Sequence, residues 1–127
     1  MATASKDSTG SGSKLSTRLI EVTDLEGTGL SDVTSGAATI YSIDIANSLS
    51  AITYVRLYDS GSPTYATTDS DILIPVASGG GGTTRNVWII AQGVSFGTGV
   101  SLHAHSDDGP GGTGALGTGP TVLMLTA

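Results

Sequence analysis

One segment of the chain matches a pattern that serves catalysis in other proteins. Gly93-Val94-Ser95-Phe96-Gly97 fits G-x-S-x-G, with which serine hydrolases present a nucleophilic serine on a sharp turn between a strand and a helix. Val100 to His105, which follow, alternate like a strand, and no histidine comes after the candidate acids Asp107 and Asp108. Because the hydrolase order of serine, acid and histidine is not met, we interpret the segment as a glycine-framed hairpin turn. We expect a protein that is not an enzyme.

A second segment, His103-Ala104-His105, carries two imidazoles. Side chains at positions i and i+2 of a strand point the same way, so the two rings could share a Zn²⁺ or Ni²⁺ ion, with Asp107 or Asp108 as an oxygen ligand. A structural site wants four ligands, and no others are near in the sequence, so His103 and His105 are weak metal candidates. The alternatives are a hydrogen-bonded or pH-sensitive pair and ordinary solvent-facing strand residues. We expect no cofactor.

Composition favours a single β-domain. The chain has 127 residues, 19 of them glycine, no cysteine and only 13% charged residues, and it is long enough to bury about two-thirds of its unfolded surface. The net charge of −6 repels a phosphate backbone, so we expect no nucleic-acid partner. No apolar run reaches 18 residues, so we expect no membrane insertion.

Short apolar or alternating segments separated by turn formers predict the strands. The predicted strands are 19–22, 37–46, 51–59, 72–76, 87–90, 100–105 and 121–126. This pattern indicates an all-β fold, an antiparallel β-sandwich of about seven strands, Ig-like or jelly-roll-like. Pro75 predicts an edge or a strand end for 72–76, and apolar residues on both faces of 121–126 predict a central strand.

The connections between these strands lead to three further predictions. The short turn at residues 47–50 predicts a hairpin between 37–46 and 51–59. Gly93, Gly97 and Gly99 predict a second hairpin, between 87–90 and 100–105. The polar connection 60–71 has about a dozen residues, a length that suits a crossing between sheets.

The N-terminal segment differs from the rest. Residues 1–17 are rich in serine, threonine and glycine, and Lys6, Lys14 and Arg18 make this end locally positive. We predict an extended arm over residues 1–17 and a β-sandwich domain over 18–127. A solvated tail is the alternative to an arm that lies on a neighbouring subunit, and we favour the arm.

Aromatic residues are the other candidates for contacts. They exceed what a small core must hold, so some could serve self-association or docking on a scaffold; they are Tyr54, Tyr58, Tyr65, Trp88 and Phe96. Trp88 and Phe96 could instead simply fill the core.

Two stretches resemble small β-structural proteins encoded among the virion genes of tailed bacteriophages. They are IYSIDIANSLSAITYVRLYDS from Ile40, followed by Pro63-Thr64, and LIPVASGGGGTTRNVWIIAQGVSFGTGVSLH from Leu73. In that group a YSIDI–N–VYVKLYD…P hairpin precedes an IPVPAGG…I–EGV–FGTGLS hairpin. The similarity covers about half the chain and includes no catalytic signature.

This resemblance implies a non-enzymatic virion protein. Proteins of this kind are similar to capsid cement or decoration proteins, which often sit as trimers on the shell, while others belong to neck, tail or fibre assemblies. We therefore expect a homo-oligomer, a trimer, on the capsid surface of a virion that bridges subunits of the major capsid protein or another virion protein. The candidate partner-binding residues are Lys6, Lys14, Arg18, Tyr54, Tyr58 and Trp88. A receptor- or glycan-binding module that stacks Tyr65 or Trp88 on sugar is the alternative.

Overall fold

The chain folds into strands joined by loops and turns. The computed structural model describes residues 2–8, 18–107 and 116–127, with the backbone alone for residues 5–8. The strands are β1 (Thr3–Ser8), β2 (Arg18–Thr23), β3 (Ala38–Asn47), β4 (Thr53–Asp59), β5 (Ile72–Val76), β6 (Thr84–Phe96), β7 (Val100–His105) and β8 (Thr121–Thr126). Within these ranges no helix is long and apolar enough to cross a bilayer.

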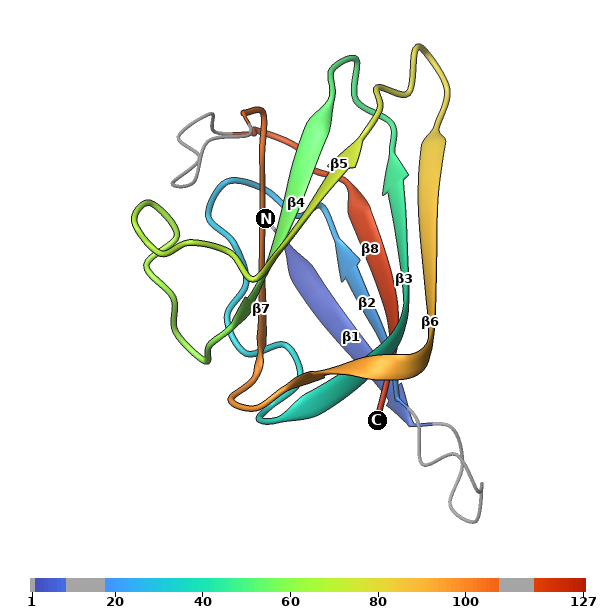
Figure 1. Ribbon diagram of the computed structural model, residues 1–127. Helices are drawn as coiled ribbons and strands as arrows, with labels where there is room; N and C mark the ends of the chain where they lie inside the picture. The colour runs from blue at the N-terminus through green and yellow to red at the C-terminus, as the bar shows by residue number, and fades with distance from the viewer. Residues whose placement is uncertain (1, 9–17, 108–115) are drawn as a thin grey trace.

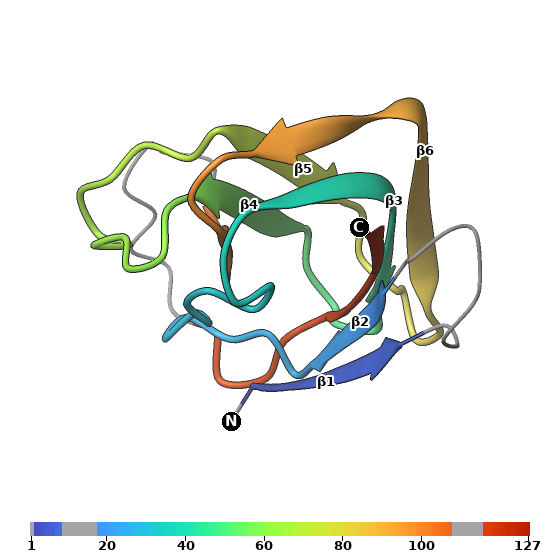
Figure 2. The same ribbon diagram turned by 90° about the horizontal axis from the view of Figure 1, so that it is seen from below.

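The strands form two antiparallel sheets that enclose the core (Figure 1 and Figure 2). The five-stranded sheet has the order β1-β2-β8-β3-β6, and the three-stranded sheet has the order β5-β4-β7. The core lies between them, where Ile43 and Ile45 of β3 and Val55 and Leu57 of β4 are buried. The predicted antiparallel β-sandwich is confirmed.

The eighth strand comes from the N-terminal segment. β1 pairs antiparallel with β2 of the same chain, from Thr3 opposite Thr23 to Ser8 opposite Arg18. Residues 3–8 therefore extend the chain's own sheet. Residues 9–17, the remainder of the predicted arm, lie outside the described part of the chain.

Two strand positions agree with the sequence pattern. β8 lies between β2 and β3, as its apolar residues on both faces predicted. Val122 and Met124 face the core, whereas Leu123 and Leu125 are partly exposed on the outer face. β5 is an edge strand, as Pro75 predicted.

The three predicted connections are wrong. β3 pairs with β6 and β8, whereas β4 pairs with β5 and β7, so the short β3–β4 turn joins the two sheets. The β6–β7 turn also crosses from one sheet to the other, and residues 60–71 connect two neighbours, β4 and β5, within one sheet. The physical reason is that packed sheets lie only about 10 Å apart, so a few residues can carry the chain across.

β6 bends sharply at an irregularity in its pairing with β3 (Figure 1). Ile40 pairs with Val94 but Ser42 pairs with Ile89, so β6 holds several extra residues at this point. Gly93 lies in this excess with φ +74°. The bend divides β6 into a long first half beside β3 and a short second half that leads to β7.

The β6–β7 turn is held by one carboxylate at the end of β4. Asp59 accepts hydrogen bonds from the backbone N–H groups of Thr98 (2.7 Å) and Gly97 (2.9 Å). These bonds, that from Thr98 first, lower the pKa of Asp59. This contact joins the end of β4 to the β6–β7 turn, 38 residues further along the chain.

Candidate interaction surface

The first half of β6 exposes three consecutive large apolar side chains. The exposed fractions are 57% for Val87, 48% for Trp88 and 81% for Ile89. Trp88 pairs with the buried Ile43 and so points toward the side of the core, while Val87 and Ile89 point to the outer face of the sheet. Large contiguous apolar exposure of this kind marks interaction surfaces in soluble proteins.

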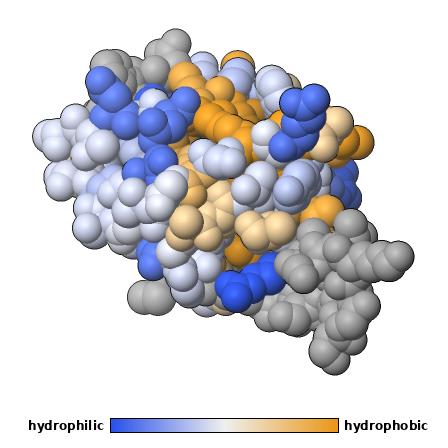
Figure 3. Space-filling model, turned by 60° about the horizontal axis from the view of Figure 1, so that its bottom comes forward, coloured by the Kyte–Doolittle hydropathy of each residue, from blue (hydrophilic) through white to orange (hydrophobic). Residues whose placement is uncertain are grey.

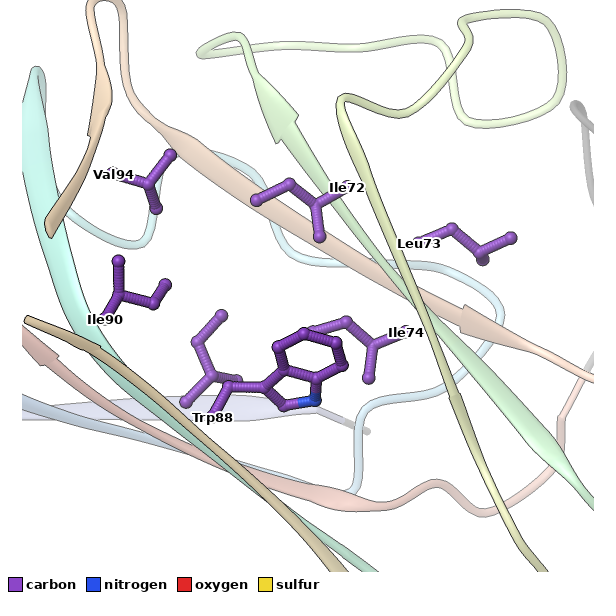
Figure 4. Close-up of a pocket in the computed structure, with 7 residues that line it drawn as sticks. Ile72, Leu73, Ile74, Trp88, Ile90 and Val94 are labelled. Atoms are coloured by element: carbon purple, nitrogen blue, oxygen red, sulfur yellow. The ribbon is translucent and has the colours of Figure 1, made fainter.

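An apolar groove of about 290 Å³ lies where the edge strands β5 and β6 face each other. Its lining residues are Ile43, Ile72, Leu73, Ile74, Trp88, Ile90 and Val94. In Figure 4, Trp88, Ile72 and Ile74 lie around the space between the two strands, while Leu73 points away from it. Figure 3 shows hydrophobic side chains gathered between hydrophilic ones on one face of the molecule.

The outer face of the five-stranded sheet continues this apolar character. One row of paired residues crosses the sheet from Ile89 through Ser42 and Leu125 to Leu19, which is 36% exposed. The next row runs from Val87 through Asp44 and Leu123 to Glu21, so two carboxylates share this face with the apolar residues, and Asp44 is ion-paired with Arg85. The solvent-facing side of an antiparallel sheet is normally polar, so the row with Ile89, Leu125 and Leu19 is the part of this face that is suited to lie against another protein.

Three of the four sheet edges are protected against pairing with another chain. The β2–β3 loop covers β7, because Leu30 and Leu102 exchange backbone hydrogen bonds of 2.7 and 2.8 Å. β5 has only five residues, and Pro75 has no N–H to donate. The sequence of β1 contains Lys6 and Asp7, and charges on an edge strand oppose its pairing.

The edge of β6 carries no such protection. From Asn86 to Phe96 the strand contains no charged residue and no proline. Arg85, just before this stretch, is ion-paired with Asp44 of the neighbouring strand. Among the described residues, β6 pairs with β3 alone; at its other edge only the side-chain amide of Asn86 reaches β5, where it donates a hydrogen bond of 3.2 Å to the carbonyl oxygen of Pro75.

The predicted partner-binding residues do not form one surface. Trp88 lies on the open edge, and Arg18 begins β2, with Nη1 3.4 Å from the carbonyl oxygen of Thr34. Tyr54, on β4 of the other sheet, is partly exposed. Lys6 lies in β1, and Lys14 is outside the described residues. Phe96 fills the core, whereas Trp88 does not.

Tyr58 is placed in the interior. Its side chain is only 1% exposed, because the 60–71 connection folds back and packs Tyr65 edge-on against it, with ring centroids 5.4 Å apart. Its hydroxyl has no hydrogen-bond partner within the described part of the chain. Burial raises the pKa of this phenol. Tyr58 is therefore a packing residue in this structure and not the surface contact we expected.

Replacing Tyr58 with phenylalanine tests this placement. We expect Tyr58→Phe to leave the free energy of unfolding unchanged or to raise it by about 1 kcal/mol, because a buried hydroxyl without a partner is costly. Urea unfolding measures this change, and Tyr54→Phe at the partly exposed position is the matched control. A loss above about 1 kcal/mol for Tyr58→Phe would show that the hydroxyl has a stabilising partner.

The two histidines lie in a buried cluster on the outer face of the three-stranded sheet. His103 and His105 point the same way, as predicted, with ring centroids 4.8 Å apart, and Tyr65 stacks on His103 at the same distance. Arg56 is also buried and donates a hydrogen bond from Nε to Nε2 of His105. Of the alternatives, solvent-facing histidines are thus wrong, because the loops that cover this small sheet remove both rings from solvent.

The hydrogen bonds of the cluster assign one ring proton to each histidine. His103 Nε2 lies 2.9 Å from the carbonyl oxygen of Gly27, which can only accept, so this nitrogen carries the proton. His105 Nε2 accepts from Arg56, so its proton is on Nδ1, 3.6 Å from a carboxylate oxygen of Asp107. Burial is the main cause that lowers the pKa of both histidines, and the nearby Arg56 lowers both further.

Neither chemical motif forms a complete site. Ser95 lies within β6, its Oγ 3.4 Å from Thr39 Oγ1, and β6 is followed by a turn and a strand where a nucleophile elbow needs a helix. The described residues hold no group of three or more histidine, cysteine, aspartate or glutamate side chains that could bind a metal ion. Asp108, one proposed ligand, is outside them.

The apolar outer face was missed by the sequence analysis, although one signal for it was present. No charged residue occurs between Arg85 and Asp107, and the run Val87 to Ile90 is apolar without alternation. Such a run indicates a strand with apolar residues on both faces.

Comparison with protein-family models and with curated protein sequences finds no match for this chain.

Proposed function

We propose that the protein is a non-enzymatic structural component of a bacteriophage particle, a cement or decoration protein that binds major capsid subunits at the virion surface. The observation that carries the proposal is the row of apolar side chains Leu19, Leu125 and Ile89 on the outer face of the five-stranded sheet. The resemblance of two stretches to phage virion proteins supports it independently.

The physical requirements of such a role are modest. A protein that reinforces a shell needs contact area and flat surfaces, and stable interfaces bury about 800 Å² on each partner. A five-stranded sheet face with exposed leucine, valine and isoleucine can supply this area without conformational change. The negative net charge of −6 favours a protein surface over a nucleic acid as the partner.

The groove beside Trp88 does not favour the glycan-binding alternative. Sugar recognition combines aromatic stacking with hydrogen bonds to hydroxyl groups, whereas every residue that lines the groove is apolar. Tyr65, the other candidate for stacking on sugar, packs against Tyr58 and His103. Neither aromatic residue therefore combines a free face with polar partners.

Binding to phage heads that lack the protein tests the proposal. We expect the purified protein to load onto such heads in a fixed ratio to the major capsid protein, measured by co-sedimentation and quantitative gel analysis. Leu19→Lys should reduce the bound amount at least about tenfold, because it places a charge in the buried contact. Leu19 lies on β2, away from the open edge of β6.

Ile52→Lys provides the matched control. Ile52 is 49% exposed in the β3–β4 turn, so the same substitution there should leave head binding unchanged. Far-ultraviolet circular dichroism verifies that both variants are folded. A folded wild-type protein that does not bind heads would reject the capsid proposal and direct attention to tail, neck or fibre assemblies.

A further inference from the structure

We infer that two copies of this chain associate through the open edges of their β6 strands, forming one continuous sheet across a two-fold axis. The first argument is the contrast among the four edges. β7 is covered by a loop, β5 is short and carries Pro75, and β1 contains Lys6 and Asp7. β6 alone combines an uncovered edge, exposed apolar side chains and, after Arg85, an absence of charge.

Charge selects a second β6 as the occupant of this edge. The chain carries a net charge of −6, yet β6 has no charged residue after Arg85, whose charge is balanced by Asp44. A neutral apolar strand pairs best with an equally neutral apolar strand, and β6 of another copy is such a strand. Pairing with the edges of β1 or β5 would meet the features that protect them.

The register of such a pair is self-complementary. With Trp88 on the two-fold axis, Val87 of each copy lies opposite Ile89 of the other, and all three residues belong to the regular part of β6, from Thr84 to Ile89. Arg85 then lies opposite the segment in which β6 bends, so no like charges face each other. Residues directly opposite in an antiparallel pair point to the same face. The two Trp88 side chains would therefore meet on the groove side and cover the space between β5 and β6.

The pairing gives the apolar edge and the groove one common explanation. Five strands from each copy would form a ten-stranded sheet, and the outer faces with Val87 and Ile89 would become continuous. A two-fold pair closes on itself, unlike a head-to-tail contact between different edges. The inference thus specifies a dimer where the phage resemblance implied a trimer, and it does not depend on binding to a capsid.

The oligomeric state in solution tests the inference without any partner. Sedimentation equilibrium should give twice the monomer mass of 12.6 kDa, with dissociation on dilution. Ile89→Lys should weaken the dimer about 100-fold, because a lysine in the paired edge is an unpaired charge within the interface. Ile89 is 81% exposed, so the monomer should fold normally.

The control and a second measurement locate the interface. Ile52→Lys, the same change at an exposed isoleucine outside β6, should leave the dimer intact. Amide hydrogen exchange in residues 86–91 should slow at concentrations that favour the dimer and stay fast in Ile89→Lys. A wild-type monomer at high concentration, a trimer, or a dimer that survives Ile89→Lys would overturn the inference.

Discussion

Acidification from pH 7.5 to pH 4.5 should lower the free energy of unfolding steeply, because His103 and His105 are buried beside Arg56. Both histidines are neutral in the cluster, and burial, followed by the neighbouring cation, lowers their pKa values. The unfolded chain returns them to about 6.5. In the folded protein, protonation would place three positive charges together in a space from which water is excluded.

The sign of the effect follows from proton linkage. Between the lowered folded pKa and the unfolded value of about 6.5, the unfolded chain binds more protons, so stability falls as the pH falls through this window. Each histidine contributes a slope of at most about 1.4 kcal/mol per pH unit. Asp107 faces His105 and partly opposes the lowering of its pKa. Two phenols also lie against the cluster, those of Tyr58 and Tyr65, and both stay neutral at these pH values because burial raises their pKa.

Urea unfolding at a series of pH values measures the slope. His103→Gln keeps an amide N–H that can reach the carbonyl oxygen of Gly27 but cannot titrate, and His105→Gln keeps an acceptor for Arg56. The double variant should therefore lose most of the dependence above pH 4.5. Asp24 and Asp59 have lowered pKa values, so their contribution to the free energy of unfolding is lost only near or below pH 4. If the free energy of unfolding of the wild-type protein does not change between pH 6.5 and pH 4.5, the explanation by buried neutral histidines is contradicted.

Most strand positions could be predicted from the sequence because they depend on local patterns, although β6 covers Thr84–Phe96 where only 87–90 was predicted. Tyr41, Ile43 and Ile45 alternate with polar residues, and β3 covers Ala38–Asn47 where 37–46 was predicted. The pairing of strands could not be predicted in this way. A turn of a few residues after β3 can return the chain beside itself or carry it to the facing sheet, and only the packing of Ile43 and Val55 across the core distinguishes the two.

The candidate surface shows the same limit. The apolar run Val87 to Ile90 predicted a strand, but its exposure depends on β6 being an edge, which is a property of the whole sheet. The burial of His103 and His105 depends on two loops distant in sequence, one with Gly27 and the other with Tyr65. β1 was missed because its residues are polar and its pairing with β2 is made by the backbone.

Gly93→Ala should destabilise the protein by about 2–5 kcal/mol, because both the backbone and the neighbours of this residue exclude a side chain. At φ +74° an L-residue costs about 1–2 kcal/mol, and overpacking adds about 1–3 kcal/mol. A Cβ atom here would lie 2.3 Å from Cγ2 of Thr39 and 2.9 Å from the ring of Tyr41. Gly93 thus serves the bend in β6, and its place in the G-x-S-x-G pattern has a structural explanation.

Gly80→Ala separates the two causes. Gly80 also has a positive φ, +57°, but a Cβ atom there would meet nothing within 4 Å, so this variant should cost only the backbone part, about 1–2 kcal/mol. Urea unfolding gives the free energy of unfolding of both variants. The difference between their losses measures how tightly β6 packs against β3 at the bend. Equal losses would show that Thr39 and Tyr41 move aside without cost. The bend fixes where the straight half of β6 ends. If Gly93→Ala lowers the free energy of unfolding more than Gly80→Ala does, it should therefore also weaken the association of two copies through Val87 to Ile89.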